Sequence, residues 1–191
     1  MTLDGRFMIV RSVFILCVLG FSLICRAENR VVDVDASKIT FSGEHAGSEF
    51  TGTFKRWQAL ISIESGSQPR LTNIEASFDL ASATTGNKMH DGTLPEEDWF
   101  YVEKHPSAKF VSTGISEPNP GQFQVTGDFT LRGVTKPLDM TLSFSDLSAS
   151  PIQIQGTFDI DRLVYGVGLE SDPEAEWVSR NIQIILDLQA Q

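Results

Sequence analysis

Three histidines, His45, His90 and His105, are the residues best suited to acid–base or metal chemistry in this chain. Acidic residues follow the second of them closely, at Asp91, Glu96, Glu97 and Asp98. Imidazole nitrogens and carboxylate oxygens could together hold zinc or non-haem iron. No two of the histidines have the spacing that such sites usually show, so we expect a solvated acidic loop and no metal site.

Nucleophilic chemistry has little support in the sequence. Both cysteines, Cys17 and Cys25, lie in the first 27 residues, so a chain that begins after them has no thiol nucleophile and no disulfide. A Ser-His-Asp triad is not excluded by counting, but there is no Gly-x-Ser-x-Gly elbow and no glycine-rich phosphate loop. We therefore predict no catalytic residue and no cofactor, and an enzyme ranks lowest among the possible classes.

The first 27 residues have the pattern of a secretory signal peptide. Arg6 and Arg11 form a basic segment, residues 12–24 are an uninterrupted apolar run, and Ala27 suits cleavage by a signal peptidase. The run is short for a transmembrane helix, so an uncleaved anchor is the less favoured alternative. A lipoprotein is less favoured still, because the bulky Ile24 precedes Cys25. We expect a cleaved signal peptide over residues 1–27 and one domain over residues 28–191.

The charge of that domain limits its partners. Residues 28–191 contain 12 basic and 24 acidic residues, a net charge of −12. A surface this acidic argues against nucleic acid and against anionic lipid headgroups as partners.

Alternation of apolar and polar residues dominates the domain and is typical of strands with one buried face. It is clearest in residues 74–80, 123–131, 138–144, 152–160 and 182–188, and weaker in residues 31–42, 50–64 and 108–115. The apolar phase changes between Phe54 and Trp57, which predicts a bulge and bend near Lys55-Arg56. About eight strands in one antiparallel meander favour an all-β, up-and-down barrel over a sandwich.

The long connection over residues 81–107 interrupts this pattern. Thr93-Leu94-Pro95-Glu96 has the form of a capping box with proline in the first turn, which predicts a short helix running through Trp99 and Tyr101. Trp99 and Phe100 are candidates for a lid over the end of the barrel, and core packing is the alternative.

The inward phase of the predicted barrel combines phenylalanines with unusually small residues. We expect the lumen to be lined by Phe41, Gly52, Phe54, Ala76, Phe78, Phe110, Ser112, Phe123, Gly127, Phe129, Met140, Leu142, Gly156 and Phe158. The small residues suggest an apolar lumen with room in it. Alternatively, the glycines merely permit curvature beside the aromatic rings.

Several motifs resemble those of the YceI family, over essentially all of the domain. They include Gly52-Thr53-Phe54, Asp98-Trp99-Phe100, His105-Pro106-Ser107-Ala108-Lys109-Phe110, Gly127-Asp128-Phe129-Thr130-Leu131-Arg132-Gly133-Val134-Thr135-Lys136-Pro137 and Asp161-Arg162-Leu163-x-Tyr165-Gly166-Val167-Gly168. The chain is most similar to the branch that is also found fused to cytochrome b561-like membrane domains. The resemblance implies a lipocalin-like barrel in the periplasm, enclosing a polyprenyl chain or an isoprenoid quinone.

These observations lead to two main hypotheses. The first is a non-catalytic periplasmic protein that sequesters or carries an isoprenoid lipid. Its headgroup would be neutral, or charged and left in water, because the basic residues are scattered along an acidic chain. The second is an accessory protein whose outer surface docks onto a membrane redox protein related to cytochrome b561.

Overall fold

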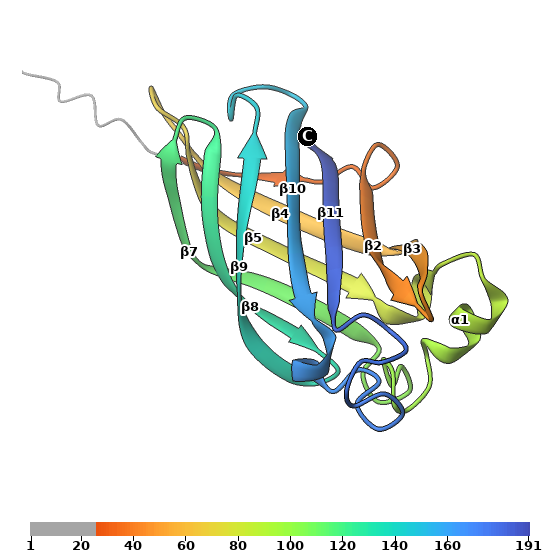
Figure 1. Ribbon diagram of the computed structural model, residues 1–191. Coiled ribbons are helices and arrows are strands. Elements are labelled where there is room, and N and C mark those ends of the chain that lie inside the picture. Colours follow the sequence, from red (N-terminus) through yellow and green to blue (C-terminus); the bar gives the residue numbers. More distant parts are fainter. Residues whose placement is uncertain (1–25) are drawn as a thin grey trace, which may run out of the picture.

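The computed structural model describes residues 26–191, which form one strongly curled antiparallel sheet (Figure 1). Its strands are β1 (Arg26–Val31), β2 (Lys38–His45), β3 (Ser48–Phe54), β4 (Trp57–Ser65), β5 (Arg70–Asp79), β6 (Ala83–Thr84), β7 (Ser107–Asn119), β8 (Gln122–Leu131), β9 (Val134–Phe144), β10 (Ile152–Asp161) and β11 (Asn181–Ala190). The helices are α1 (Lys88–Thr93) and two 3₁₀ turns, η1 (Leu80–Ser82) and η2 (Arg162–Tyr165). The predicted all-β class with a short helix in a long connection is confirmed.

The eleven strand segments found over residues 26–191 correspond to eight strands, three of which are interrupted. β1 continues into β2, β3 into β4 and β5 into β6, each after a break of a few residues. The two halves of one long strand pair with the two halves of the next long strand, as β1 pairs with β4 while β2 pairs with β3. Counted in this way, neighbours in the chain are neighbours in the sheet, as an up-and-down barrel requires.

The first and last strands meet and close the sheet. β11 pairs with β2, with Leu186 opposite Ile39, and the backbones of Val31 and Gln191 exchange hydrogen bonds of 3.1 and 2.9 Å. The weak seam is between β9 and β10, which pair only where residues 154–156 face residues 142–144. Beyond that short ladder β9 continues to pair with β8, and β10 with β11.

The predicted bend at Lys55-Arg56 is confirmed. β3 ends at Phe54, β4 begins at Trp57, and the two residues between them leave the ladder. The Lys55 N–H donates to the Ser82 carbonyl (3.1 Å), and the Arg56 carbonyl accepts from the Asp79 N–H (3.0 Å). The bend therefore separates the half of this long strand that pairs with β2 and β6 from the half that pairs with β1 and β5.

The helix of the long connection lies earlier than the sequence predicts. Asn87, not Thr93, is its N-cap, and the Asn87 side chain accepts from the Met89 N–H at 2.9 Å. Thr93 is the last helical residue, and its hydroxyl donates back to the Met89 carbonyl (3.0 Å). Pro95 follows the helix, a common position for proline after a C-cap. Trp99 and Phe100 therefore lie on turns, and the prediction of a helix through them is wrong.

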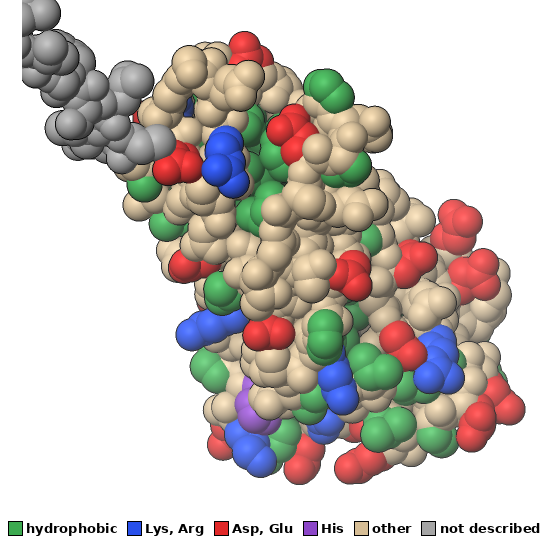
Figure 2. All heavy atoms as spheres, turned by 90° about the vertical axis from the view of Figure 1, so that its left-hand side faces the viewer, with side chains coloured by type: hydrophobic (Ala, Val, Ile, Leu, Met, Phe, Trp, Pro, Cys, Tyr) green, Lys and Arg blue, Asp and Glu red, His purple; other side chains and the backbone are tan. Residues whose placement is uncertain are grey.

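Charged side chains are scattered over the outside of the barrel. Figure 2 shows acidic side chains spread over one face, with basic ones between them. No helix in residues 26–191 is long and apolar enough to cross a membrane.

Candidate functional site

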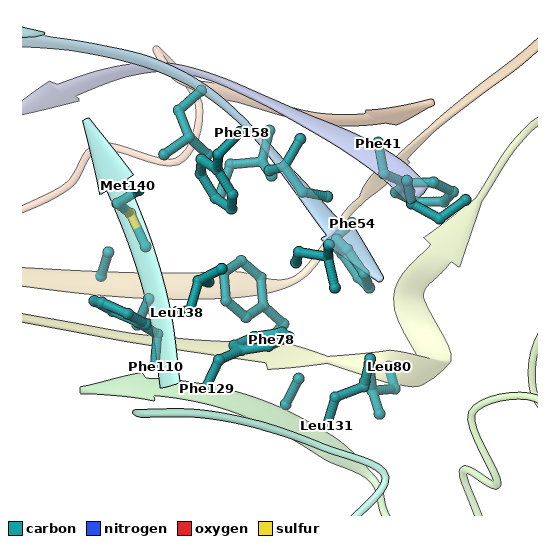
Figure 3. A pocket seen from close by; sticks show the side chains of 18 of the residues that line it. Phe41, Phe54, Phe78, Leu80, Phe110, Phe129, Leu131, Leu138, Met140 and Phe158 are labelled. Atoms are coloured by element: carbon teal, nitrogen blue, oxygen red, sulfur yellow. The ribbon is translucent and has the colours of Figure 1, made fainter. Parts of the chain in front are cut away.

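An apolar cavity of about 190 Å³ occupies the inside of the barrel. Figure 3 shows side chains from many strands pointing toward one another around it, among them Phe54 and Phe78, whose ring centroids are 5.5 Å apart. Among residues 26–191, Arg162 is the one charged lining residue, and Trp99 adds an indole N–H. The cavity therefore offers dispersion contacts and burial from water, with little polar chemistry.

The cavity is closed at one end of the barrel and hollow toward the other. On β10, Ile152 and Ile154 are fully buried, whereas Phe158 is half-buried although it lies on the same inward phase. β11 shows the same gradient, from buried Leu188 to half-buried Ile184. Since Phe158 and Ile184 line the cavity, their residual exposure reflects empty space inside the barrel.

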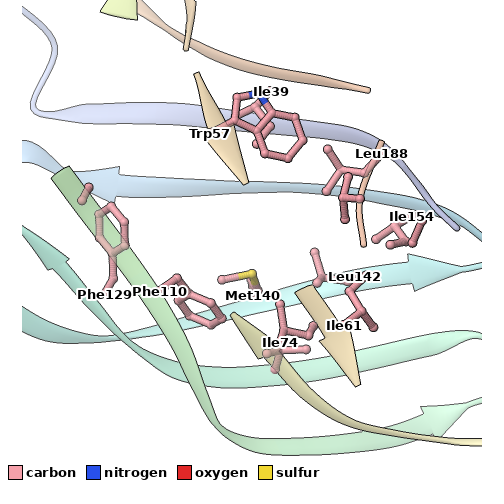
Figure 4. Close-up of a cluster of buried hydrophobic side chains, with 14 of the residues drawn as sticks. Ile39, Trp57, Ile61, Ile74, Phe110, Phe129, Met140, Leu142, Ile154 and Leu188 are labelled. Carbon is pink, nitrogen blue, oxygen red and sulfur yellow. The ribbon is translucent and has the colours of Figure 1, made fainter. Parts of the chain in front are cut away.

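The filled end is a tightly packed core (Figure 4). Ile61, Ile74, Leu142, Ile154 and Leu188 point toward one another there and are almost fully buried. Residues at this end close the cavity and hold the strands together, so the ends of the barrel have different roles.

Most of the predicted lumen residues line the cavity. They are Phe41, Phe54, Ala76, Phe78, Phe110, Phe129, Met140, Leu142 and Phe158, and the predicted lid residues Trp99 and Phe100 line it as well. Whether they contact a ligand stays a prediction.

Five predicted lumen residues lie elsewhere, for identifiable reasons. Phe123 packs on Phe144 at the filled end, with ring centroids 5.1 Å apart. The Ser112 hydroxyl accepts from the Ile74 N–H (2.9 Å) and donates to Asn73, so it joins β7 to β5 at the residue where the register of β7 against β8 shifts. The three others are Gly52, Gly127 and Gly156, which do not line the cavity.

Neighbouring side chains occupy the space beside these three glycines. A Cβ atom at Gly52 would overlap the Phe41 ring, and one at Gly127 would overlap the Phe110 ring. At Gly156 the overlap would be with the tip of Leu142. The expectation that these glycines add open volume is wrong, and they serve instead to let large side chains lie across them.

The sequence also missed a set of lining residues. Strand residues such as Leu131, Leu138 and Leu186 follow the same alternation and could have been included on that ground. Leu94 and Val178 come from the connections after α1 and η2, and no periodic signal marks them. They reach the cavity because both connections fold over the hollow end of the barrel (Figure 1).

Arg162 organises one of these connections. Its guanidinium donates to the carbonyls of Val167 (2.7 Å), Val178 (2.9 Å) and Ser179 (3.1 Å), and forms a salt bridge with Asp172 (2.6 Å). Burial lowers the pKa of Arg162, and the charge of Asp172 partly offsets this. Although Arg162 lines the cavity, its hydrogen-bonding capacity is used by the protein.

Asp172 is the buried partner of this arginine. Burial alone would raise the pKa of the carboxyl group, but hydrogen bonds from the N–H groups of Val178, Trp177 and Glu176 hold it below 3.8. The pair therefore holds residues 162–180 in place, and neither of its two charges is left unpaired for a ligand.

The two connections are joined to each other over the hollow end. The Asp98 carboxylate accepts from the N–H groups of Glu170 and Ser171, both at 2.9 Å. Trp99 lies under Arg162, with 5.7 Å from the guanidinium carbon to the ring, and Gly168 packs on the same indole. Arg132, from the β8–β9 hairpin, donates to the carbonyls of Glu97 and Gly166. We call residues 94–101 and 162–180 the cap.

Two of the three histidines meet at the edge of the cap. His90 Nε2 lies 3.1 Å from His45 Nδ1, and the two rings are edge to face. His45 is the last residue of β2 and His90 lies on α1. We call these two residues the histidine pair. His105 lies apart from them, with its ring centroid 5.9 Å from that of Tyr101. Within residues 26–191 no three histidine, cysteine or acidic side chains form a metal-binding group.

Comparisons with known proteins agree with this architecture. A UPF0312 protein of Pseudomonas savastanoi pv. phaseolicola (strain 1448A / Race 6) is 33% identical over 128 residues. The match covers 65% of this chain and 66% of the relative, which is just under two thirds of its length. BcnA of Burkholderia cenocepacia matches with a TM-score of 0.75 and 24% identity over 84% of this chain and 99% of that one. A polyisoprenoid binding domain from Saccharophagus degradans, implicated in plant cell wall breakdown, matches with a TM-score of 0.65 and 19% identity. The match covers 85% of this chain and 97% of that domain.

These two structures support the fold alone, because their sequence identities are low. The family model for the YceI-like domain matches residues 31–190, which is nearly the whole of the described chain. The protein therefore belongs to the YceI-like domain family.

Proposed function

We propose that this protein is a non-catalytic carrier that holds the tail of an isoprenoid lipid, a polyprenyl chain or an isoprenoid quinone, inside its barrel. The observation that carries the proposal is the cavity, which is apolar on all sides and whose one charged lining residue is already satisfied. Such a space binds hydrocarbon, since each CH₂ group removed from water contributes roughly 0.8 kcal/mol. The polyisoprenoid binding domain of Saccharophagus degradans, which shares the fold, supports the choice of lipid.

We place this function in the periplasm. The support is the predicted signal peptide, of which residues 1–25 lie outside the described part of the chain. β1 begins at Arg26, so cleavage after Ala27 would leave Glu28–Val31 of that strand, which still pairs with β4. The relation to cytochrome b561-fused domains and the docking onto a membrane redox protein stay predictions.

Filling the cavity with a larger side chain tests the proposal. Ala76 lines the cavity between Ala59 and Phe110 of the neighbouring strands. We expect Ala76→Phe to lower the affinity for a fluorescent polyprenyl analogue about tenfold, because displacing about two buried CH₂ groups costs roughly 1.6 kcal/mol. The melting temperature should not fall, since the new ring occupies empty space.

Val111→Phe is the matched control. Val111 lies on β7 next to Phe110 but faces outward, and 44% of its surface is exposed. The same added bulk should leave lipid affinity unchanged there. Equal affinities of the wild type and the Ala76→Phe variant would exclude the cavity as the lipid site.

A further inference from the structure

The polar end of a bound lipid needs a place outside the apolar cavity. Inside it, the Arg162 guanidinium is committed to Asp172 and to backbone carbonyls, and the other lining side chains among residues 26–191 have no polar atom except the indole nitrogen of Trp99. Burying an oxygen-bearing headgroup there without a partner would cost several kcal/mol. The headgroup therefore belongs where the cavity wall meets polar side chains with unused hydrogen-bonding capacity.

The histidine pair lies against the cavity wall. The His90 ring contacts the ring of Phe50, with centroids 5.9 Å apart, and Phe50 lines the cavity while remaining half-buried. The Leu94 N–H donates to the His90 carbonyl (2.9 Å), and Val178 forms a β-bridge with His45. Since Leu94 and Val178 also line the cavity, three lining residues adjoin the pair.

The pair has hydrogen-bonding capacity to spare in either of its neutral forms. One imidazole N–H lies between His90 Nε2 and His45 Nδ1, and the direction of that bond depends on the tautomers. In both directions the two remaining ring nitrogens are one N–H donor and one bare acceptor. In the described part of the chain neither remaining nitrogen has a protein hydrogen-bond partner.

Three carboxylates near the cap do not have this freedom. Asp98 is held by Ser171, and Asp172 by Arg162. Asp91, which follows His90 on α1, accepts from Thr84 and from Thr85. The histidine pair thus adjoins the cavity with a free donor and a free acceptor, which none of these three carboxylates offers.

We propose that the histidine pair binds a neutral, oxygen-bearing headgroup of the lipid, such as a quinone carbonyl or an alcohol hydroxyl. This inference rests on the proposed function, and it adds the headgroup class and the residues that contact it. A carbonyl would accept from the free imidazole N–H, and a hydroxyl could also donate to the bare nitrogen. Glu44 and Asp91 adjoin the two histidines in sequence, and residues 28–191 have a net charge of −12, which disfavours a diphosphate.

Four probes with the same tail test this proposal: an isoprenoid quinone, a polyprenyl alcohol, a polyprenyl diphosphate and the hydrocarbon without a headgroup. We expect the wild type to bind the quinone and the alcohol about tenfold more tightly than the hydrocarbon. His90→Leu and His45→Leu should remove this preference while leaving hydrocarbon binding unchanged. His90→Gln, which keeps an amide donor and acceptor, should retain part of it.

His105→Gln is the control, because His105 is the histidine that lies apart from the pair. Melting curves of all variants show whether each is folded. A headgroup preference that survives in both leucine variants would overturn the proposal. The headgroup would then bind at another opening of the barrel, such as the seam between β9 and β10. A loss of hydrocarbon binding equal to that of the quinone would assign the pair a structural role, and tightest binding of the diphosphate would overturn the neutral class. If the wild type binds none of the four probes, the proposed function itself fails.

Discussion

At the scale of single residues, the glycines of the inward face differ in what surrounds them. A Cβ atom at Gly127 would meet the Phe110 ring and also the carbonyl oxygen of Val111, at 2.6 Å. At Gly156 it would meet chiefly the end of the Leu142 side chain. A backbone atom cannot move aside as a flexible side chain can.

We therefore expect Gly127→Ala to destabilise the protein by about 1–3 kcal/mol and Gly156→Ala by clearly less. Urea denaturation of the two variants measures the difference. Lipid binding by the folded fraction should be preserved in both, because neither glycine lines the cavity. Equal costs at the two positions would contradict this assignment of their contacts.

The buried Arg162–Asp172 pair predicts a dependence of stability on pH. The carboxyl pKa of Asp172 is below 3.8 in the folded protein, so the pair contributes its full stability above that value. The contribution is lost as the pH falls through the folded-state pKa, where the carboxylate takes up a proton. The free energy of unfolding should consequently decrease on acidification below about pH 4.

Asp172→Asn isolates this effect. The variant should be about 3–5 kcal/mol less stable at neutral pH, because it leaves the buried Arg162 charge without its partner. Its stability should also depend less on pH in the acid range. An unchanged acid profile in this variant would show that other carboxylates cause the loss of stability.

Sequence reasoning located single residues well where a periodic pattern was present. Phe41, Phe78 and Phe129 were placed in the lumen because alternation along a strand determines which face a side chain occupies. The error at Gly127 arose because the absence of a side chain does not reveal whether a neighbour fills the space. The His45–His90 contact was missed because the two residues are 45 positions apart and meet only through the fold.

At the scale of elements, the cap is held to the barrel by polar contacts and closes the cavity with Trp99. The indole is half-buried, lines the cavity, and packs on Gly168 and Arg162. The structure therefore shows Trp99 as a packing residue at the hollow end, and its role as a lid stays a prediction.

We expect Trp99→Ala to accelerate release of a fluorescent polyprenyl analogue more than tenfold, because dissociation requires the end of the cavity to open. Stopped-flow dilution measures this rate. Trp177→Ala is the control, since Trp177 lies in the same cap but is 62% exposed and does not line the cavity. Equal release rates in the two variants would leave Trp99 as a packing residue only.

The elements themselves were predictable to different degrees. The strands followed from alternation, and the bend at Lys55-Arg56 followed from a change in its phase. The helix was misplaced because Thr93 and Glu96 fit a capping pattern, whereas the actual N-cap, Asn87, lies six residues earlier. The cap could not be predicted, because its order comes from long-range contacts such as that of Asp98 with Ser171.

At the scale of the whole molecule, the barrel is asymmetric along its axis. One end is packed by its own side chains, and the other is hollow and covered by the cap. Each strand therefore contributes both to stability and to the cavity, at opposite ends of its inward face. Alternation alone predicts the closed sheet, but not the point along each strand where packing gives way to empty space.

On the proposed function, an isoprenoid lipid occupies this cavity in the native protein. Native mass spectrometry of the protein, purified without detergent from the compartment where it resides, detects such a lipid. We expect a bound mass that organic solvent removes and whose fragments repeat at five-carbon intervals. A protein that carries no lipid, or only lipids with straight fatty acyl chains, would contradict it.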